Sequence, residues 1–242
     1  MGDYVAQSSS TRMKTTAIKA KSQTRQVFER LREDILTGKL LPGSKLNIAS
    51  LAEELGVSAG AVREGLAMLE AESLVLSEPA RGFRVSPVSV DDLQELVKAR
   101  IEVEKLCLAE AIRHGGLEWE GAIVAAFHRL TRLSERDVSD PSRVNHEWAS
   151  AHGEFHQALI SACPNRWLRR LHETLYEQSE RYRRLSAPAD AVRRDVASEH
   201  RAMMDAVLNH DVCKAQELMA AHVNATARLL ISSPRLALLD NA

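Results

Sequence analysis

The sequence predicts a mainly α-helical protein built in two parts. Hydrophobic residues make up 45% of the 242 residues but aromatic residues only 4%, so the core must consist mostly of Leu, Ala, Val and Ile, which favours packed helices. Short helical patterns alternate with turn signals over residues 21–88, and long amphipathic patterns fill residues 89–235. Residues 1–20 are rich in Ser and Thr and lack periodicity, so we expect a disordered basic arm there.

Residues 21–88 contain the signals of three short helices and a hairpin. The expected elements are helices at Gln23–Thr37, Ile48–Leu55 and Ala59–Glu72, followed by strands at Leu74–Ser77 and Gly82–Ser86. Gly56 and Val57 lead into Ser58, a good N-cap, and form a tight turn between the second and third helices. Helix, helix, turn, helix and hairpin in that order predict a winged helix-turn-helix.

Residues 89–235 predict six long helices. The expected helices are Asp91–His114, Glu118–Arg136, Ser142–Ala162, Asn165–Leu185, Ala189–Asn209 and Val212–Ile231. Ser89, followed three residues later by Asp92, resembles a capping box at the start of the first of them. Because the connecting loops are short, neighbouring helices must run antiparallel, and the sequence predicts a six-helix antiparallel bundle.

The helix-turn-helix pattern predicts a DNA-binding surface, although alone it also fits an αα-hairpin of another helical protein. The start of the second helix of the motif enters the major groove, where Arg63 can reach a phosphate or a guanine edge. The candidate DNA contacts are Arg32, Lys45, Ser50, Ser58, Ala59, Gly60, Arg63, Arg81, Gly82 and Arg84. One such domain contacts too little DNA for tight binding, so we expect a homodimer on a nearly palindromic double-stranded operator. The net charge of -1 argues against DNA binding, but it averages over parts with different roles.

Four histidines on three expected helices predict a metal site. His152 and His156 are four residues apart and share one helix face. His200 and His222 lie on the last two helices on either side of a turn at residues 209–211, and can therefore sit at similar heights in the bundle. Four inward imidazoles could hold one Zn²⁺ or Ni²⁺, with no organic cofactor, but His pairs at this spacing also occur by chance on solvated faces.

The run from Gln26 to Val85 resembles the GntR family of regulators. The matching segments are LREDILTGKLLPGSKL, LAEELGVS, AVREGL and GFRVS, in that order. The helical remainder is similar to the FadR subfamily, whose effector domain is called FCD. Many relatives carry Arg where this chain has Ala49 and Ala59, and Ala where it has Gly65, so the resemblance implies DNA binding to an unusual operator.

The resemblance also implies roles for residues of the second part. Metal-containing FCD domains have an Asp-x-x-Phe-His motif and one His on each of two later helices, which His156, His200 and His222 match. His152 stands at the Asp position, so the site loses a negative charge and could favour a softer metal, bind metal more weakly, or hold an anionic ligand directly. Arg100 matches an arginine that in relatives reaches the effector's carboxylate, which a guanidinium binds bidentately.

Two candidate effector-binding residues also have simpler interpretations. Arg100 could instead be a surface residue that pairs with Glu104 or Glu95. Tyr182 falls on the same helix face as Leu175 and could line the effector pocket, but a Tyr in such a position is more often part of the core.

Together these features predict a transcription regulator, a repressor of a catabolic operon that a small carboxylate releases from DNA. The segment from Leu117 through Tyr182 is similar to regulators of short dicarboxylate catabolism, which hints at a dicarboxylate. One alternative is a metal-responsive regulator, in which the metal itself is the signal. Another is a zinc enzyme, but we expect no enzyme, because no HExxH motif or nucleophile elbow is present and Glu154 points off the face of the histidines. Three widely spaced cysteines and no apolar run of membrane length predict a cytoplasmic protein without a membrane partner.

Overall fold

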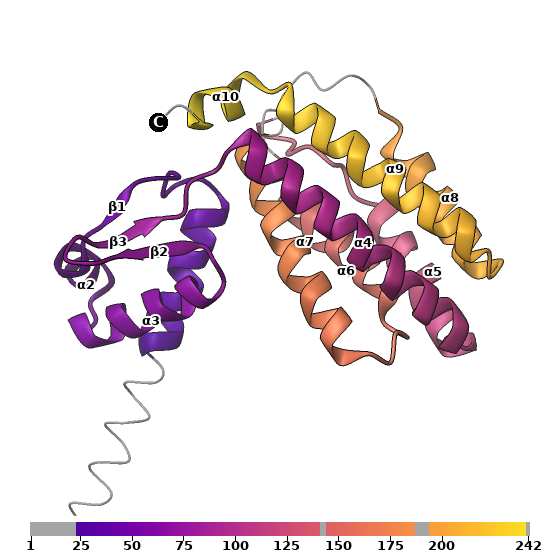
Figure 1. Cartoon of the computed structure of the whole chain (residues 1–242), viewed down its shortest axis with the longest axis horizontal. Coiled ribbons are helices and arrows are strands. Elements are labelled where there is room, and N and C mark those ends of the chain that lie inside the picture. The colour runs from indigo at the N-terminus through magenta and orange to yellow at the C-terminus, as the bar shows by residue number, and fades with distance from the viewer. Residues whose placement is uncertain (1–22, 141–143, 187–193, 241–242) are drawn as a thin grey trace, which may run out of the picture. The chain divides into compact units, whose positions relative to one another are not determined.

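The structure, a computed structural model, describes residues 23–140, 144–186 and 194–240. It is mainly helical, which confirms the predicted fold class, and it divides into two compact units, Met1–Pro87 and Val88–Ala242 (Figure 1). The expected arm at residues 1–20 lies outside the described residues. No helix in the described part of the chain is long and apolar enough to cross a membrane.

The N-terminal unit is a winged helix-turn-helix. A helix over residues 23–36 comes first, and the further elements are β1 (Lys45–Leu46), α2 (Ile48–Leu55), α3 (Ala59–Ala71), β2 (Val75–Glu78) and β3 (Gly82–Val85). The strands form an antiparallel sheet in the order β1-β3-β2, with Val75 opposite Val85. β1 is an addition to the expected elements, because its two residues are too few to show a strand pattern in the sequence.

Local signals set the turn between α2 and α3. Gly56 ends α2 in the left-handed region, at a φ of 64°, which a residue without a Cβ adopts at little cost. Ser58 caps α3 by accepting a hydrogen bond from the Ala61 N–H at 3.1 Å. Val62 and Leu66 on α3 are fully buried in the core that the helices share with the sheet. The opposite face of α3, with its N-terminal residues, is therefore held toward solvent.

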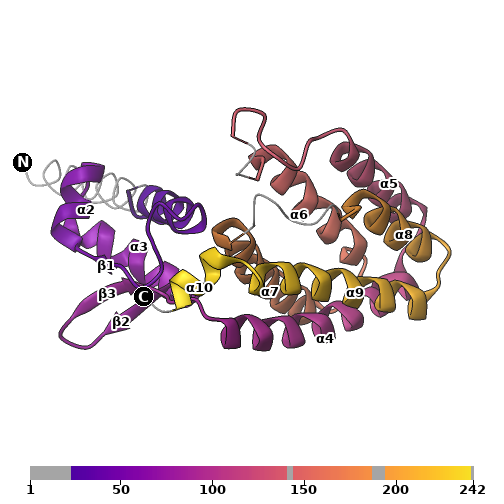
Figure 2. The same cartoon turned by 90° about the horizontal axis from the view of Figure 1, so that it is seen from above.

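The C-terminal unit is a helical bundle. Its helices are α4 (Val90–His114), α5 (Leu117–Thr131), α6 (His146–Ile160), α7 (Arg166–Ser186), α8 (Val196–Leu208), α9 (Val212–Ile231) and α10 (Pro234–Asp240). α4 packs against α7 and α9, whereas α5 packs against α6 and α8 (Figure 2). Ser89 caps α4 by accepting a hydrogen bond from the Asp92 N–H at 3.0 Å, as the sequence predicts. The helices enclose a core of aliphatic and aromatic side chains such as Ile123 and Phe155.

Some helix ends differ from the expected ones. α5 ends at Thr131 rather than Arg136, and Arg136 instead pairs with Val144 in an isolated antiparallel bridge, which needs an extended backbone. α8 begins after Asp195, its N-cap, while the residues from Ala189 that were expected to start this helix lie outside the described ones. α10 is an addition to the six expected helices.

Candidate metal centre and DNA-binding surface

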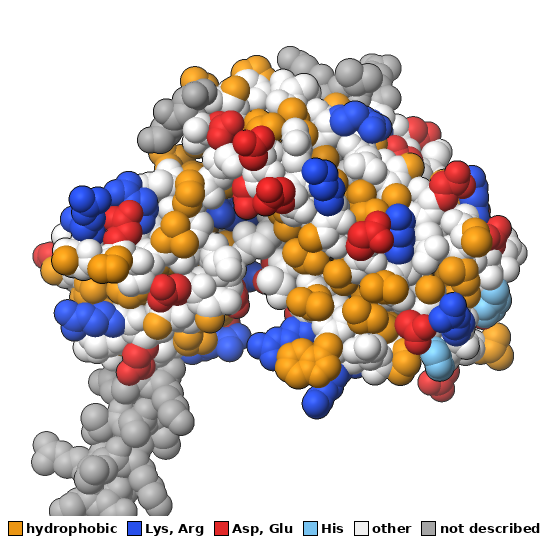
Figure 3. All heavy atoms as spheres, in the orientation of Figure 1, with side chains coloured by type: hydrophobic (Ala, Val, Ile, Leu, Met, Phe, Trp, Pro, Cys, Tyr) orange, Lys and Arg blue, Asp and Glu red, His pale blue; other side chains and the backbone are white. Residues whose placement is uncertain are grey.

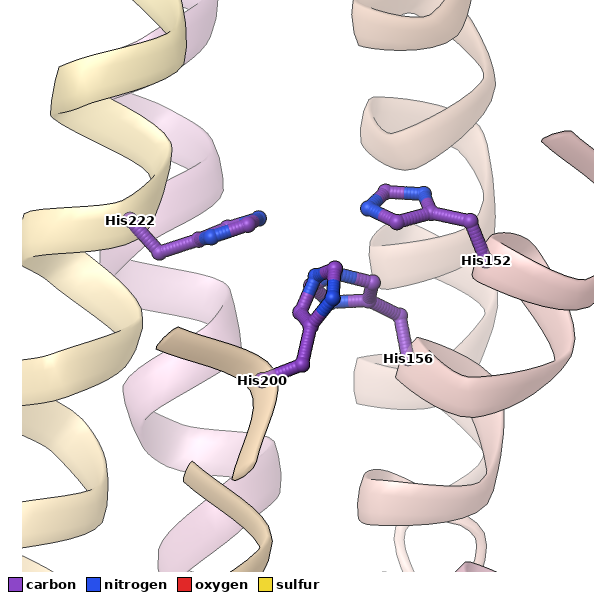
Figure 4. A group of neighbouring side chains, drawn as sticks. All are labelled: His152, His156, His200 and His222. Atoms are coloured by element: carbon purple, nitrogen blue, oxygen red, sulfur yellow. The ribbon is translucent and has the colours of Figure 1, made fainter. Parts of the chain in front are cut away.

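The structure brings together the four histidines that the sequence singles out. His152 and His156 project from α6, His200 from α8 and His222 from α9, and Figure 4 shows their rings pointing toward one another. All four are buried, and one ring nitrogen of each lies within 4.8 Å of those of the others. We call this group the histidine cluster. Three helices hold it in place, so its geometry depends on the packing of the whole bundle.

Several nitrogen atoms of the histidine cluster have no protein partner. Both ring nitrogens of His156 and Nε2 of His200 are buried without a hydrogen bond among the described residues. A buried polar atom left unsatisfied costs about 1–3 kcal/mol, so a bound partner would stabilise a cluster that holds three such atoms. Imidazole nitrogens are good ligands for Zn²⁺ and Ni²⁺, and the residues present therefore fit a divalent transition-metal ion.

The imidazoles of the histidine cluster are kept neutral. Burial lowers the pKa of His152, His156 and His200, and repulsion between neighbouring histidines lowers it further, to about 2 for His200. Burial also lowers the pKa of His222, although a hydrogen bond to Glu199 acts in the opposite direction. Neutral rings have the free lone pairs that a metal ion requires.

Groups outside the histidine cluster orient two of its rings. Nδ1 of His222 donates to the Glu199 carboxylate at 2.9 Å, which leaves Nε2 of that ring free for a metal ion. Arg194 fixes Glu199 in turn, donating from Nε at 2.6 Å and also from Nη2. Burial alone would raise the pKa of Glu199, but the hydrogen bonds to His222 and Arg194 outweigh it and lower the pKa to about 2. Nδ1 of His152 lies 2.8 Å from the hydroxyl oxygen of Tyr176.

Arg100 is buried rather than on the surface. Its Nε donates to Glu104 at 3.1 Å, and its guanidinium carbon lies 4.8 Å from the centre of the Tyr176 ring. Glu104 is completely buried, and its second oxygen lies 3.2 Å from Nε2 of His172. Burial alone would raise the pKa of Glu104, but the charges of His172 and Arg100 lower it to about 2. Nε of Arg100 is therefore used by an internal ion pair with Glu104, although the resemblance implies that the Arg100 guanidinium binds the effector.

Tyr182, on α7, packs against the start of α4 and does not contact the histidine cluster in the described residues. Its hydroxyl donates to Asp92 at 2.5 Å and accepts a hydrogen bond from the Ser89 N–H at 3.2 Å. Tyr176, six residues earlier on α7, contacts the histidine cluster instead. The sequence carries one signal that points to Tyr176, because His172 precedes it by four residues and shares its helix face.

A cavity of about 270 Å³ reaches the histidine cluster at His200. It is lined by Leu130, Thr131, Leu133, Glu135, Trp148, Arg194, Asp195, Val196, Ala197 and His200. Trp148 stacks on the ring of His152, with the two ring centres 4.8 Å apart. Trp148, Arg194 and Glu199 are not predictable from the sequence, because no motif marks them and only the packing of α5, α6 and α8 brings them to the site. A small molecule in this cavity would therefore lie beside His200.

Most candidate DNA contacts are exposed on the N-terminal unit. The exposed ones are Lys45, Ser50, Ser58, Ala59, Gly60, Arg63, Arg81 and Gly82. Arg32 instead donates to Glu72 at 3.0 Å, and Arg84 donates to Glu78 at 3.3 Å. These two arginines therefore form ion pairs within the N-terminal unit. On the face that Figure 3 shows, basic side chains are interspersed with acidic ones. Binding of DNA by this unit would therefore rest on a few well-placed side chains rather than on a broad basic patch.

Each unit also matches a known family. Residues 23–85 match the bacterial regulatory proteins of the gntR family, and residues 95–225 match the FCD domain. The chain is 42% identical to the HTH-type transcriptional regulator BphR of Paraburkholderia xenovorans (strain LB400), over 82% of this chain and 81% of that protein. It is 32% identical to the HTH-type transcriptional repressor GlaR of Escherichia coli (strain K12), over 80% of this chain and 89% of that protein.

Solved structures share the fold. A GntR regulator from Rhodococcus sp. RHA1 superimposes with a TM-score of 0.68 at 23% identity, covering 87% of this chain and 99% of that one. E. coli McbR/YncC superimposes with a TM-score of 0.67 at 21% identity, covering 86% of this chain and 96% of that one. The matching families and relatives are transcription regulators and not enzymes. The chain therefore belongs to the GntR family of bacterial transcription regulators and carries an FCD domain as its effector domain.

Proposed function

We propose that this GntR regulator is a repressor that binds its operator as a homodimer, and that a small carboxylate bound at a metal ion in the FCD domain releases it. The observation that carries the proposal is the histidine cluster, in which three buried nitrogens have no hydrogen-bond partner among the described residues and which meets a cavity at His200. The name of GlaR as a repressor supports repression as the mode of action.

The charge of the site favours an anionic effector. Four neutral imidazoles leave the two positive charges of Zn²⁺ or Ni²⁺ without compensation, and Glu199, whose carboxylate touches the histidine cluster, is already engaged by Arg194. A carboxylate bound to the metal supplies the missing negative charge. Arg100 would orient this carboxylate through its terminal nitrogens, since Nε is used by Glu104.

On the DNA side, α3 would enter the major groove with its N-terminal residues. Ser58, Gly60 and Arg63 are exposed at this end of the helix, and Arg81 is exposed in the turn between β2 and β3. This arrangement suits a recognition helix with a wing beside it. A dimer would place two such helices on successive turns of the operator.

Metal content and operator binding, measured together, test the proposal. The full-length protein should carry about one Zn²⁺ or Ni²⁺ per chain in elemental analysis. It should also bind an operator selected from random duplexes, and small carboxylic acids should weaken this binding only in the metal-loaded protein. The double variant His200→Ala with His222→Ala should lose both the metal and the acid response but still bind DNA. Stoichiometric metal in this variant would contradict the ligand assignment.

The same titrations separate the proposal from a metal-responsive regulator. If adding metal changes operator affinity and no acid does, the metal itself is the signal. A zinc enzyme is opposed by the families and also by Glu154, which is exposed and pairs with Arg129 at 3.2 Å. That carboxylate is not placed to act as a general base at the histidine cluster.

A further inference from the structure

We infer that the effector is a small monocarboxylate with an apolar body rather than a dicarboxylate. This inference rests on the proposed function and adds to it the chemical class of the ligand. It is drawn from the side chains that line the cavity meeting the histidine cluster at His200.

Two of the residues that line the cavity suit one anionic group. His200 lines it, and Nε2 of this ring is buried without a partner among the described residues. Arg194 also lines it, with its guanidinium fixed by Glu199 and by a hydrogen bond to the Thr226 hydroxyl at 2.7 Å. A carboxylate beside these two residues would therefore meet both a fixed positive charge and the proposed metal ion.

Half of the residues that line the cavity are apolar. Leu130, Leu133, Val196 and Ala197 contribute aliphatic surface, and Trp148 contributes an indole ring. Trp148 is held rigidly, since it stacks on His152 and the Arg183 guanidinium lies 5.1 Å from its ring centre. A rigid aromatic side chain among aliphatic ones recognises an alkyl chain or an aromatic ring and offers little to a charged group.

Two acidic side chains oppose a second carboxylate. Glu135, in the segment between α5 and α6, and Asp195, at the start of α8, both line the cavity. Asp195 accepts hydrogen bonds from the N–H and the hydroxyl of Ser198, which lower its pKa and keep it ionised. The lining thus has two negative charges and one positive charge, and Arg194 is already paired with Glu199. The far carboxylate of a dicarboxylate would be repelled.

The size of the cavity limits the effector further. Its volume of about 270 Å³ lies just below the range of about 300–1,000 Å³ that is typical of pockets for larger ligands. Hexanoate and benzoate are probes of the expected class. Adipate and terephthalate are their matched controls, because each has the same carbon skeleton as its partner, or that skeleton with one further carbon, and carries a second carboxylate.

Calorimetric titration of the metal-loaded full-length protein with these four acids tests the inference. We expect hexanoate and benzoate to bind at least about tenfold more tightly than adipate and terephthalate, and no binding after the metal has been removed with a chelator. Tighter or equal binding of the dicarboxylates that still needs the metal would overturn the inference and leave the proposed function standing. If none of a wider set of small carboxylates binds in a metal-dependent way, the proposed function fails as well.

Two variants at half-buried positions test the lining directly. Glu135→Lys should improve adipate binding at least about tenfold with little change for hexanoate, because it replaces a repelling charge by an attracting one. The control is Glu118→Lys, which makes the same change at an exposed position of α5 outside the cavity lining. Leu133→Asn should weaken hexanoate more than adipate. An unchanged ratio of hexanoate to adipate affinity in both cavity variants would show that the acids bind elsewhere.

Discussion

Arg63 is exposed near the N-terminus of α3, four residues beyond the first residue of the helix. Arg63→Ala should weaken operator binding by about 1–3 kcal/mol if the side chain reads a guanine, because a bidentate base contact is worth that much. Fluorescence anisotropy with the operator measures the loss, and a salt series separates a base contact from a phosphate contact, which lowers the salt slope by about one. Arg228→Ala on α9 changes another exposed arginine and is the control. Unchanged operator affinity of Arg63→Ala would mean that α3 is not the recognition helix.

Glu199 acts on the proposed metal ion through His222. The Glu199 carboxylate accepts a hydrogen bond from Nδ1 of His222 and is held by Arg194. Glu199→Gln removes its negative charge. Metal affinity should therefore fall about 10–100-fold, as it does when other hydrogen-bond partners of metal ligands are changed. Competition with a chromophoric chelator measures the affinity. Glu217→Gln, at an exposed carboxylate on α9 that pairs with Lys214, should leave it unchanged. Equal metal affinity in both variants would assign Glu199 a purely structural role.

Arg100 and Glu104 form an ion pair inside the bundle, so removing one partner should lower the free energy of unfolding. Arg100→Met leaves the Glu104 charge buried with His172 as its remaining contact, and should lower the free energy of unfolding by about 3–5 kcal/mol. Adding Glu104→Gln removes that unpaired charge and should recover part of the loss. Urea unfolding of the two single variants and the double variant gives the coupling energy. Simple additivity of the two changes would show that the pair is not an energetic unit.

At the scale of elements, Gly65 lets α3 approach the helix at residues 23–36. A Cβ at this position would lie 2.7 Å from Cγ1 of Val27, so the Val27 side chain or one of the two helices would have to shift. Gly65→Ala gains about 1 kcal/mol of helix propensity, but the overpacking it causes costs about 1–3 kcal/mol, so the unit should become less stable.

Gly60→Ala is the matched control for Gly65→Ala in the same helix. A Cβ at Gly60 would meet only the Ser58 hydroxyl oxygen, at 3.8 Å, so this change should not lower stability. Thermal unfolding followed by circular dichroism compares the two variants. A higher melting temperature for Gly65→Ala than for Gly60→Ala would refute the close packing.

Elements marked by local signals were predictable from the sequence. Gly56 and Ser58 set the turn of the helix-turn-helix through backbone conformation and capping, which depend on neighbouring residues only. The spacing of His152 and His156 placed them on one face in the same way. Trp148 could not be assigned, because its role depends on how α6 packs against the segments that form the cavity. The rotation of α7 likewise decides that Tyr176, and not Tyr182, reaches the histidine cluster, and it follows from long-range packing.

At the scale of the whole molecule, α7 links the histidine cluster to the end of the FCD domain that follows the DNA-binding unit in the chain. Tyr176 contacts His152, while Tyr182 binds Ser89 and Asp92 at the first turn of α4, next to the boundary after Pro87. The two tyrosines are about 9 Å apart along one helix. A shift of α7 on effector binding would therefore act on the N-terminus of α4, from which the connection to the winged helix-turn-helix begins.

This connection predicts that Tyr182→Phe uncouples the two sites without removing either. The variant keeps the buried ring but loses the hydroxyl contacts to Ser89 and Asp92, so metal and acid affinity should match the wild type. In the wild type, the acid should weaken operator binding about 5–150-fold, a coupling of about 1–3 kcal/mol, and the operator must weaken acid binding by the same factor. In Tyr182→Phe both factors should fall together.

Anisotropy titrations with and without acid, and calorimetric titrations with and without operator, give the two factors independently. Asp92→Asn should reduce the coupling as well, because it weakens the acceptor of the Tyr182 hydroxyl, whereas Asp91→Asn changes its neighbour in the same exposed first turn and should leave the coupling intact. A lower coupling in both aspartate variants, with full coupling in Tyr182→Phe, would trace the effect to the charge of the α4 N-terminus rather than to the tyrosine contact. Full coupling in Tyr182→Phe would show that the signal does not pass through α7, and that the effector must act on the DNA-binding unit along another helix of the bundle.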